Sequence, residues 1–426
     1  MALTRRQLLA GTASGLLGSA LLGTAGCGRG AYLAPEDTIS MWYWNRSISD
    51  TLLAKTPKDT GVKLAAQKIG GDFRAKLLTS LAGKAYVPDV TGLNEDIATY
   101  FPDEDQFFDL NELGAEEVKS QYLEWKWLRG QAPSGRFIGF PMDTGPTALY
   151  YREDLFEAAG LPTEPDEVAQ RVATWDGFFE LGTQLVEANP DVKLLPRGND
   201  VFDRVVGQSG ERYMDEQNRF IGDGEHLRRA WDLAIESNER KLTARIDANF
   251  SPEWNAAVST GAVASLVGAV WVAQIMADGA KDTSGKWRLC RAPDGPGNWG
   301  GSFLGITKYC RDPEAAWEVV KYVQSPENQL VYGLNEYKLY PAAASALDDP
   351  RAQVEDPFFG GQVTNAVFAE SAKEVKPVYL SPYDNVIGPC FTDQLTLTWS
   401  AGKDPDRAWQ DALREVDRQL SHLGLI

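Results

Sequence analysis

Histidine is nearly absent from this chain of 426 residues, which contains only His226 and His422. Neither one has a second histidine, a cysteine or a glutamate at the spacing of a metal-ligand set. Motifs that are built on histidine, such as zinc ribbons and Ser-His-Asp triads, are therefore poorly supported. We predict no resident metal and no cofactor, and we expect both histidines to be ordinary surface residues.

Positive charge is also in short supply, because 42 lysines and arginines face 60 aspartates and glutamates, for a formal net charge of −18. Such a surface repels nucleic acid and anionic lipid, so neither is expected as the main partner. The sign is unfavourable for a highly anionic ligand as well, although a local basic pocket can override a global field. Aromatic content is high, with 13 tryptophans, and guides the functional hypotheses more than the charge does.

The chain opens without a strongly apolar run of membrane-spanning length. Its first apolar stretch, residues 8–22, is rich in glycine and alanine and follows Arg5 and Arg6, a pattern that resembles a twin-arginine export signal. Residues 24–27 (TAGC) resemble a lipobox, in which Cys27 becomes the lipidated first residue; cleavage nearby without lipid is the alternative. We therefore expect export and a lipid anchor on the outer face of the cell membrane, with a signal and a tether at residues 1–27 and 28–37.

Cysteine is otherwise limited to Cys290, Cys310 and Cys390. An odd number of cysteines cannot all pair within one chain. A twin-arginine substrate folds in the reducing cytoplasm before export, which disfavours disulfides. We expect three small buried apolar side chains.

From Thr38 onward, short apolar runs alternate with helical patterns, and the length of the chain favours two lobes or domains. The first elements are predicted as strand, helix, strand, helix and strand, at residues 38–44, 47–61, 62–69, 72–84 and 88–93. This order implies a parallel, doubly wound sheet with helices on both faces. Ligands of such sheets bind beyond the carboxyl ends of the strands, which places the loops after Trp44 and Leu93 on one edge.

Later segments follow in a recognisable order: PDV at residues 88–90, GFPMDTGPTALYYREDLFEAAGLP at 139–162, TWDGFFEL at 174–181, GAVW at 268–271, GNWGGSFLGI at 297–306 and PEAAWEVVKYVQSPENQ at 313–329. The ordered set resembles family 1 extracellular solute-binding proteins of ABC importers, in particular their maltose- and multiple-sugar-binding group. The resemblance covers nearly the whole chain.

The resemblance implies an α/β, two-lobed periplasmic-binding-protein fold, of the class with crossing hinge strands, with the ligand cleft between the lobes. Lobe 1 would comprise residues 38–143 plus 302–339, and lobe 2 residues 144–301 plus 340–426. The implied function is capture of a neutral sugar or oligosaccharide and its delivery to the permease subunits of an ABC transporter. We expect a monomer that catalyses nothing.

A sugar site needs flat aromatic rings for the apolar sugar face and planar polar groups for the hydroxyls. Trp44, Asn45 and Arg46 follow the first strand and meet that need. By strand alternation, Trp42 and Trp44 share one face; we expect Trp42 to pack in the core and Trp44 to reach the cleft. For Asn45, a plain turn residue at the strand end is an equal alternative.

Asn94 and Asp96 follow the third strand, and the resemblance matches Asp96 to a carboxylate that takes sugar hydroxyls in the relatives. The alternative is an acid that favours the start of a helix. Asp143 falls at an implied hinge crossing and would face the cleft; its alternative is a turn carboxylate that accepts local amides.

The second half of the chain supplies further candidates. Trp271 matches a position where the family often holds an aromatic against the ligand, and a core tryptophan is the alternative. Trp299 lies beside Gly300, where a missing side chain lets the backbone approach closely. Tyr383 and Asp384 lie where the relatives add contacts from the second lobe.

Other ligands and one enzymatic function remain open. A polyamine suits the acidic balance, and a glycerol phosphoester would need basic residues such as Arg46. Some relatives bind ferric iron through tyrosines, although Tyr150 and Tyr151 are better explained by strand packing. A secreted polysaccharide hydrolase would need a carboxylate pair, for which Asp96 and Asp143 are the only proposal, and no hydrolase motif accompanies them.

Overall fold

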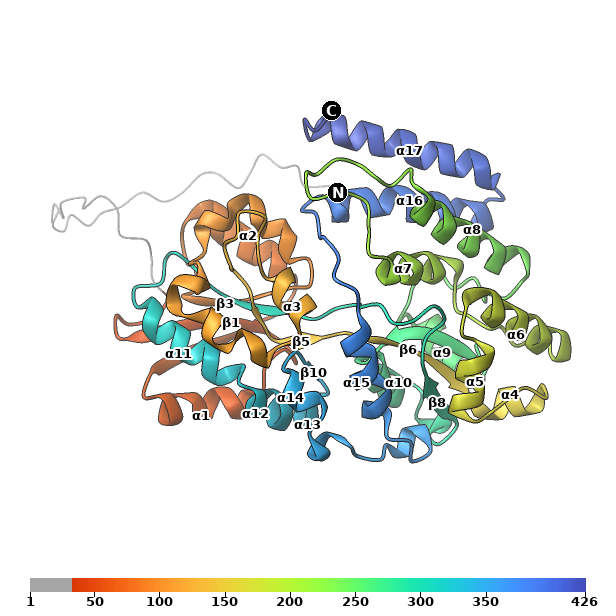
Figure 1. The fold of residues 1–426 in the computed structure, drawn as a ribbon, viewed down its shortest axis with the longest axis horizontal. Coiled ribbons are helices and arrows are strands. Elements are labelled where there is room, and N and C mark those ends of the chain that lie inside the picture. The colour runs from red at the N-terminus through yellow and green to blue at the C-terminus, as the bar shows by residue number, and fades with distance from the viewer. Residues whose placement is uncertain (1–32) are drawn as a thin grey trace, which may run out of the picture.

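The structure is a computed structural model that describes residues 33–426. The expected signal and Cys27 lie outside the described residues. Figure 1 shows the helices and strands in two groups, one around β1 and β3 and one around β6 and β8, with β5 and β10 between them. Within the described residues, no helix is both long and apolar enough to cross a membrane.

The first group is built on a five-stranded sheet in the order β2-β1-β3-β9-β4. Its strands are β1 (Thr38–Trp44), β2 (Lys63–Ile69), β3 (Val90–Leu93), β4 (Phe140–Pro141) and β9 (Phe303–Ile306). The parallel pairing of β1 with β2 and β3 confirms the predicted unit. Strand β9, which the prediction for residues 38–93 did not cover, joins the same sheet and runs antiparallel to β3 and β4. It enters from the second half of the chain without a helical crossover.

Helices cover both faces of this sheet, as predicted. Helix α1 (Asp50–Thr60) begins where the Ser49 side chain accepts the Leu52 N–H and ends at Gly61, which has a φ of 75°. With α11 (Pro313–Val323) it packs on the face that carries Met41 and Tyr43. Helix α2 (Phe73–Gly83) covers the opposite face and buries Trp42, which is 2% exposed. The alternation of β1 therefore sends its aromatic residues into two different cores.

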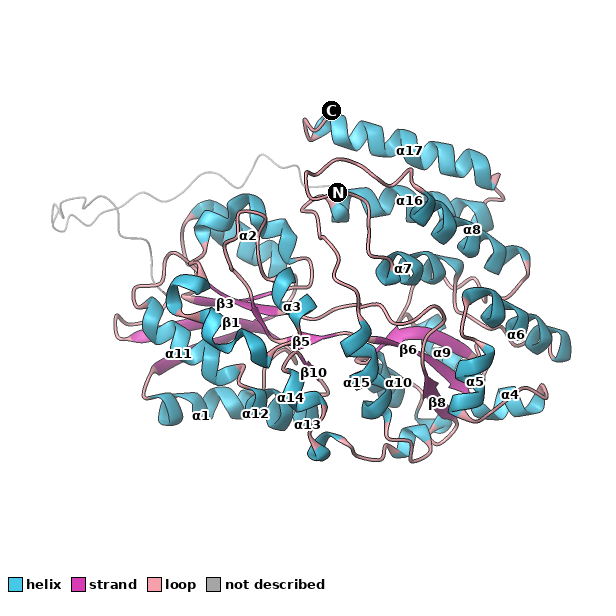
Figure 2. Ribbon diagram, viewed as in Figure 1, coloured by secondary structure: helices cyan, strands magenta, loops and turns pink. Residues whose placement is uncertain are grey.

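The second group contains a three-stranded sheet of β6 (Thr147–Arg152), β7 (Ser265–Ala269) and β8 (Trp287–Cys290), all antiparallel. The helices outside it include α6 (Trp175–Ala188), α7 (Gly198–Gln208), α8 (Glu225–Glu239), α16 (Asp384–Ser400) and α17 (Pro405–His422), which are stacked outward in Figure 2. Tyr150 and Tyr151 are fully buried, and their hydroxyls donate to backbone oxygens of Ala269 and Thr163. Strand packing thus explains this tyrosine pair, as predicted.

The remaining elements connect or cover the two sheets. The helices are α3 (Glu124–Arg129), α4 (Glu153–Ala158), α5 (Pro165–Arg171), α9 (Pro252–Thr260), α10 (Val272–Gly279), α12 (Pro326–Asn328), α13 (Asn335–Tyr337), α14 (Ala344–Leu347) and α15 (Thr364–Glu374). Single 3₁₀ turns fill several loops, and a π-helical turn, Gln329–Leu334, links α12 to α13.

The chain passes between the two groups at three places that lie close together. One is the segment from β4 to β6, which contains β5 (Asp143–Thr144); another is the segment from β8 to β9. The third is β10 (Tyr340–Pro341), which pairs antiparallel with β5. The lobe limits expected from the sequence stay a prediction.

The three described cysteines are free and buried, as predicted. Burial raises the pKa of Cys290 and Cys310 to about 12 and that of Cys390 to about 11, so the reactive thiolate is scarce at neutral pH. With Cys27 replaced by serine, we expect almost no reaction of the native protein with Ellman's reagent and three thiols per chain after unfolding without reductant. A smaller number after unfolding would reveal a disulfide.

Candidate functional site

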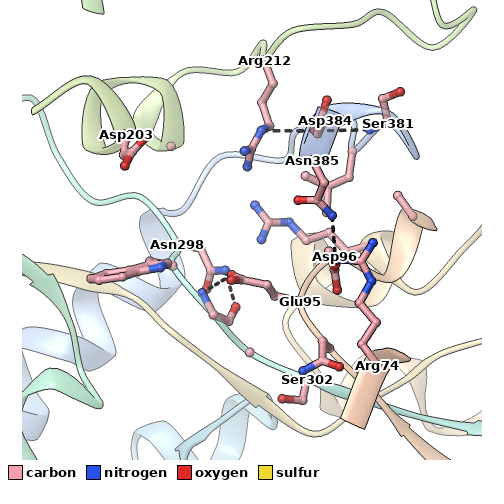
Figure 3. Close-up of a pocket in the computed structure, with 18 of the residues that line it drawn as sticks. Arg74, Glu95, Asp96, Asp203, Arg212, Asn298, Ser302, Ser381, Asp384 and Asn385 are labelled. Carbon is pink, nitrogen blue, oxygen red and sulfur yellow. Dashed lines mark hydrogen bonds and ion pairs between the residues drawn. The ribbon is translucent and has the colours of Figure 1, made fainter. Parts of the chain in front are cut away.

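A cavity of about 870 Å³ lies between the two groups of elements (Figure 3). From the first group it is lined by the end of β1, the start of α2 and the loop after β3. From the second group it is lined by α7, the start of α10 and the start of α16. Residues 298–302, between β8 and β9, complete the wall. The predicted edge of the first sheet, at the carboxyl ends of β1 and β3, is therefore part of this wall.

Trp44 contributes an indole ring from the last position of β1. It is half-buried, and its ring meets the edge of Phe73 at a centroid distance of 5.0 Å. The ring also lies over Gly92 of β3, where an added Cβ would be 2.5 Å from Trp44 Cζ3. Glycine at that position lets the indole lie flat against the sheet edge, so local sterics set the orientation of this cavity wall.

The loop after β3 contributes acids that reach across the cavity (Figure 3). Asp96 forms an ion pair with Arg74 at 2.5 Å and accepts a hydrogen bond from Asn385 Nδ2 at 2.9 Å. Glu95 accepts the backbone N–H of Gly300. Asp96 stands at the N-cap position of the 3₁₀ helix Ile97–Gln106, as the alternative of an acid at the start of a helix expects, although its side chain accepts no hydrogen bond from that helix.

A tryptophan corner, defined as Trp271 and Trp299, forms the opposite wall. The indole N–H of Trp271 donates to the backbone oxygen of Trp299 at 2.9 Å, and the rings meet edge to face at 4.6 Å. Gly300 has a φ of 98°, and a Cβ there would be 2.9 Å from Trp271 Nε1, so a side chain would break the corner. The guanidinium carbon of Arg204 lies 3.9 Å from the Trp299 ring centroid. That ring therefore already carries a cation.

Among the residues that line the cavity, three side-chain oxygens are buried and have no hydrogen-bond partner in the described part of the chain: Asn94 Oδ1, Asp96 Oδ1 and Asp384 Oδ1. Buried acceptors of this kind are costly unless a donor reaches them. The cavity thus presents unfilled acceptors beside aromatic rings. A ligand with several hydroxyl donors would satisfy the oxygens and cover the rings.

The cavity brings together seven of the predicted site residues: Trp44, Asn94, Asp96, Trp271, Trp299, Gly300 and Asp384. Four others lie outside its lining. Asn45 and Arg46 are exposed in the turn after β1, and Arg46 faces Asp278 at 3.8 Å. Tyr383 packs against the core of the second group. The ligand contacts of these three residues stay predictions, and the fourth residue outside the lining is Asp143.

Asp143 was expected to face the cleft and is instead buried outside the cavity lining, with 8% of its surface exposed. Its Oδ1 accepts the backbone N–H of Ser302 at 2.8 Å. Burial raises the pKa of Asp143, and the nearby charge of Lys126 acts against that rise. Asp143 therefore acts as a carboxylate that accepts a local backbone amide, which was the alternative, and does not form part of the cavity wall.

The sequence analysis missed the arginines of the cavity: Arg74, Arg129, Arg204 and Arg212. Arg204 lies near the end of α7 and Arg129 ends α3, in helices whose patterns indicate only packing and solvation. Nothing in the local sequence distinguishes them from surface arginines. Among the described residues, no group of three or more histidines, cysteines, aspartates and glutamates is placed to hold a metal ion.

Two α/β bodies that face each other across a polar, aromatic-walled cavity define a cleft-type binding protein. Residues 46–330 match the family model of the bacterial extracellular solute-binding proteins, and the chain belongs to this family. The fold is similar to the crystal structure of an extracellular solute-binding protein of family 1, with a TM-score of 0.85 and 29% identity over 89% of this chain and 99% of the other.

Two relatives with similar sequences are named as sugar-binding proteins. The lactose-binding protein of Rhizobium radiobacter is 26% identical over 270 residues, which are 61% of this chain and 62% of the relative. The arabinooligosaccharide-binding protein of Halalkalibacterium halodurans is 23% identical over 355 residues, 79% of this chain and 77% of the relative. The alignment thus spans less than two thirds of the lactose-binding protein.

The contact between Gly92 and Trp44 is testable by a double-mutant cycle. Gly92→Ala forces a Cβ against the indole and should lower the free energy of unfolding by about 1–3 kcal/mol, as overpacking does. In a Trp44→Ala background the same substitution should cost almost nothing. Gly83→Ala, at an open position in α2, is the matched control. An equal cost in both backgrounds would show that Gly92 does not position Trp44.

Asp384 should give the free protein a defined pH dependence. Burial raises its pKa to about 6 from the ordinary 3.8, while Arg212 at 3.3 Å and the Ser381 N–H oppose the rise. Because the pKa of Asp384 is higher in the folded state than in the unfolded state, protonation of this carboxyl group stabilises the folded state. This stabilisation is complete below about pH 4 and is lost as the pH rises through about 6.

The unfolding free energy of the wild type minus that of Asp384→Asn should therefore increase as the pH falls from about 7.5 to about 4, by an amount on the order of 2 kcal/mol. Urea unfolding at several pH values measures this difference. Asp406→Asn, at an exposed carboxylate, is the control. A difference that stays flat or decreases toward low pH would contradict the burial of Asp384.

Proposed function

We propose that this protein captures a sugar or oligosaccharide outside the cytoplasm and delivers it to an ABC transporter. The observation that carries the proposal is the set of unpartnered oxygens of Asn94, Asp96 and Asp384 beside the indole of Trp44. Sugar hydroxyls supply the missing donors, and the apolar face of a sugar ring fits an indole. The names of the lactose- and arabinooligosaccharide-binding relatives support the same ligand class.

Ligand capture in this proposal works by closure of two lobes around the cavity, with the limits 38–143 plus 302–339 and 144–301 plus 340–426. Two hydrogen bonds join the proposed lobes across the cavity: Asn385 to Asp96, and Gly300 to Glu95. Both would form or break as the lobes move about the connecting strands. A ligand that binds the closed state better shifts the protein toward it, which is the signal a transporter needs.

The proposal includes the path and partners of the protein. The chain would be exported, held on the outer face of the membrane by lipid on Cys27, and would act as a monomer. It would dock on the permease subunits of its transporter in the closed state. These elements rest on the signal-like start of the sequence and on membership of the extracellular solute-binding family.

A non-catalytic role is part of the proposal. The carboxylate pair considered for a hydrolase, Asp96 and Asp143, does not share the cavity, since Asp143 is buried against Ser302. The tyrosines considered for ferric iron, Tyr150 and Tyr151, pack within the second sheet, and their hydroxyls donate to backbone oxygens. A polyamine or a glycerol phosphoester remains as a control ligand.

A thermal-shift panel of mono-, di- and oligosaccharides tests the ligand class, with spermidine and a glycerophosphodiester as controls. A binding sugar at about 100 times its Kd should add about 2.7 kcal/mol to the stability of the folded state. Trp44→Ala should lower the affinity about tenfold or more, because it removes the stacking surface. A shift by the amine or the phosphodiester alone would contradict the proposal, as would release of reducing sugar.

Trp399→Ala is the matched control for Trp44→Ala. Trp399 is also a half-buried tryptophan, whose indole N–H donates to Asn199 at 3.2 Å, and it does not line the cavity. Its loss should lower stability without changing the sugar affinity.

A further inference from the structure

Arg204 is a buried cation without an anionic partner. It is 8% exposed and lines the cavity. It makes no hydrogen bond and no ion pair with any described residue, and its Nε is buried without a partner. Its contact is the Trp299 ring, which supports the flat guanidinium from below and leaves the N–H donors at its edge. Burial lowers the pKa of Arg204, and the nearby charges of Asp203, Asp200 and Glu95 act against that fall without pairing with the guanidinium.

Arg129 repeats this arrangement from the other group of elements. Its guanidinium carbon lies 4.9 Å from the Trp125 ring centroid, its Nε is buried without a partner, and it too has no ion pair with a described residue. Burial, and then the positive charge of Arg212, lower the pKa of Arg129 to about 10. Two aromatic-backed guanidiniums, Arg129 and Arg204, thus line one cavity.

Arg212 links these two side chains. Its charge lowers the pKa of both Arg129 and Arg204, so the Arg212 guanidinium lies within electrostatic reach of each of them. Arg212 has Asp384 as an ion-pair partner at 3.3 Å, but its Nε has no hydrogen bond of good geometry among the described residues. Three like charges of this kind are stable together only with anions between them.

The carboxylates of the cavity are largely engaged elsewhere. Five line it: Asp72, Glu95, Asp96, Asp203 and Asp384. Asp72 caps α2, Asp96 is paired with Arg74, Asp384 is paired with Arg212, and Glu95 accepts the Gly300 N–H. Asp203 alone has neither an ion pair nor a hydrogen bond among the described residues, and burial raises its pKa. Neither Arg129 nor Arg204 donates a hydrogen bond to any of these five carboxylates among the described residues, so the N–H donors of both guanidiniums are free for a ligand.

Arg129 and Arg212 also lie at a junction between two cavities. A second cavity of about 770 Å³ adjoins the first, and the two share Arg129, Arg212 and Leu380 in their walls. The second cavity adds the aromatic side chains of Phe101, Trp125 and Tyr379. Each volume is in the range of small-molecule sites, so a ligand of several sugar units that extends from one cavity into the other passes these cations.

We propose that the ligand is an acidic oligosaccharide, whose carboxylate binds to the guanidiniums of Arg129, Arg204 and Arg212. The inference rests on the proposed function and replaces the neutral sugar expected from the sequence with a uronate-type sugar. A planar carboxylate matches the fork of a guanidinium in two parallel hydrogen bonds. A single negative charge fits the local balance better than a doubly charged phosphate does, because Asp203 and Glu95 lie within electrostatic reach of the same cations.

Calorimetric titration of the full exported chain with matched ligands tests the proposal. The probes are oligomers of galacturonate, glucuronate and mannuronate, each beside its methyl ester and its carboxyl-reduced neutral form, together with lactose, arabinooligosaccharides and a sugar phosphate. At least one acid should bind about 10- to 100-fold more tightly than its own ester, as expected for charge-assisted hydrogen bonds, and its affinity should fall with added salt.

Variants test the residues named. Arg204→Gln and Arg129→Gln should remove the preference for the acid and keep the affinity for the ester, while Arg204→Lys should restore part of the preference. Arg414→Gln, at an exposed arginine of α17 outside the lining of both cavities, is the control and should change neither affinity. If a glutamine variant fails to fold, the acid-to-ester ratio of the wild type decides alone.

The outcomes separate the two proposals. Neutral sugars that bind as tightly as the acids would overturn the acidic ligand and leave sugar capture standing. A preference for the sugar phosphate over every uronate would overturn the carboxylate. Absence of binding to any saccharide would overturn the proposed function itself.

Discussion

The cavity depends on a buried hydrogen bond in which the Asp143 carboxylate accepts the Ser302 N–H, where two connections between the sheets run side by side. Gly301 allows this approach, because a Cβ there would be 2.7 Å from the backbone oxygen of Asp143. Burial lowers the pKa of Lys126 and raises that of Asp143, and each charge favours the ionised form of the other. Removing one charge of such a pair leaves the other buried without compensation, which is costly, so Asp143 and Lys126 together stabilise this junction.

The electrostatics of the site run against those of the whole chain. A net charge of −18 keeps the surface negative, yet the cavity contains guanidiniums that no described carboxylate pairs with, at Arg129 and Arg204. Aromatic rings under both cations replace part of the lost hydration. The negative net charge thus repels anionic macromolecules, while the arginines of the cavity attract an anionic group of a small ligand.

Local rules predicted the first lobe-like body well. The alternation of β1 placed Trp42 in the core and Trp44 on the cavity wall, and the helix predicted at residues 47–61 is present as α1 and ends at Gly61. The same rules failed for β9, whose antiparallel pairing with β3 joins residues more than 200 positions apart. A propensity has no information about a partner at that distance, and so the parallel order predicted for residues 38–93 did not include this antiparallel strand.

The sequence by itself determined the strands and helices, their capping residues and the aromatic and acidic loops at the carboxyl ends of β1 and β3. These follow from side-chain period and from capping, which act over a few residues. Only the tertiary structure decided that Asp143 is a buried carboxylate bonded to the Ser302 N–H, and that Arg204 is a cavity cation stacked on Trp299. Both roles come from desolvation and from neighbours far along the chain, which appear only when the two bodies are brought face to face.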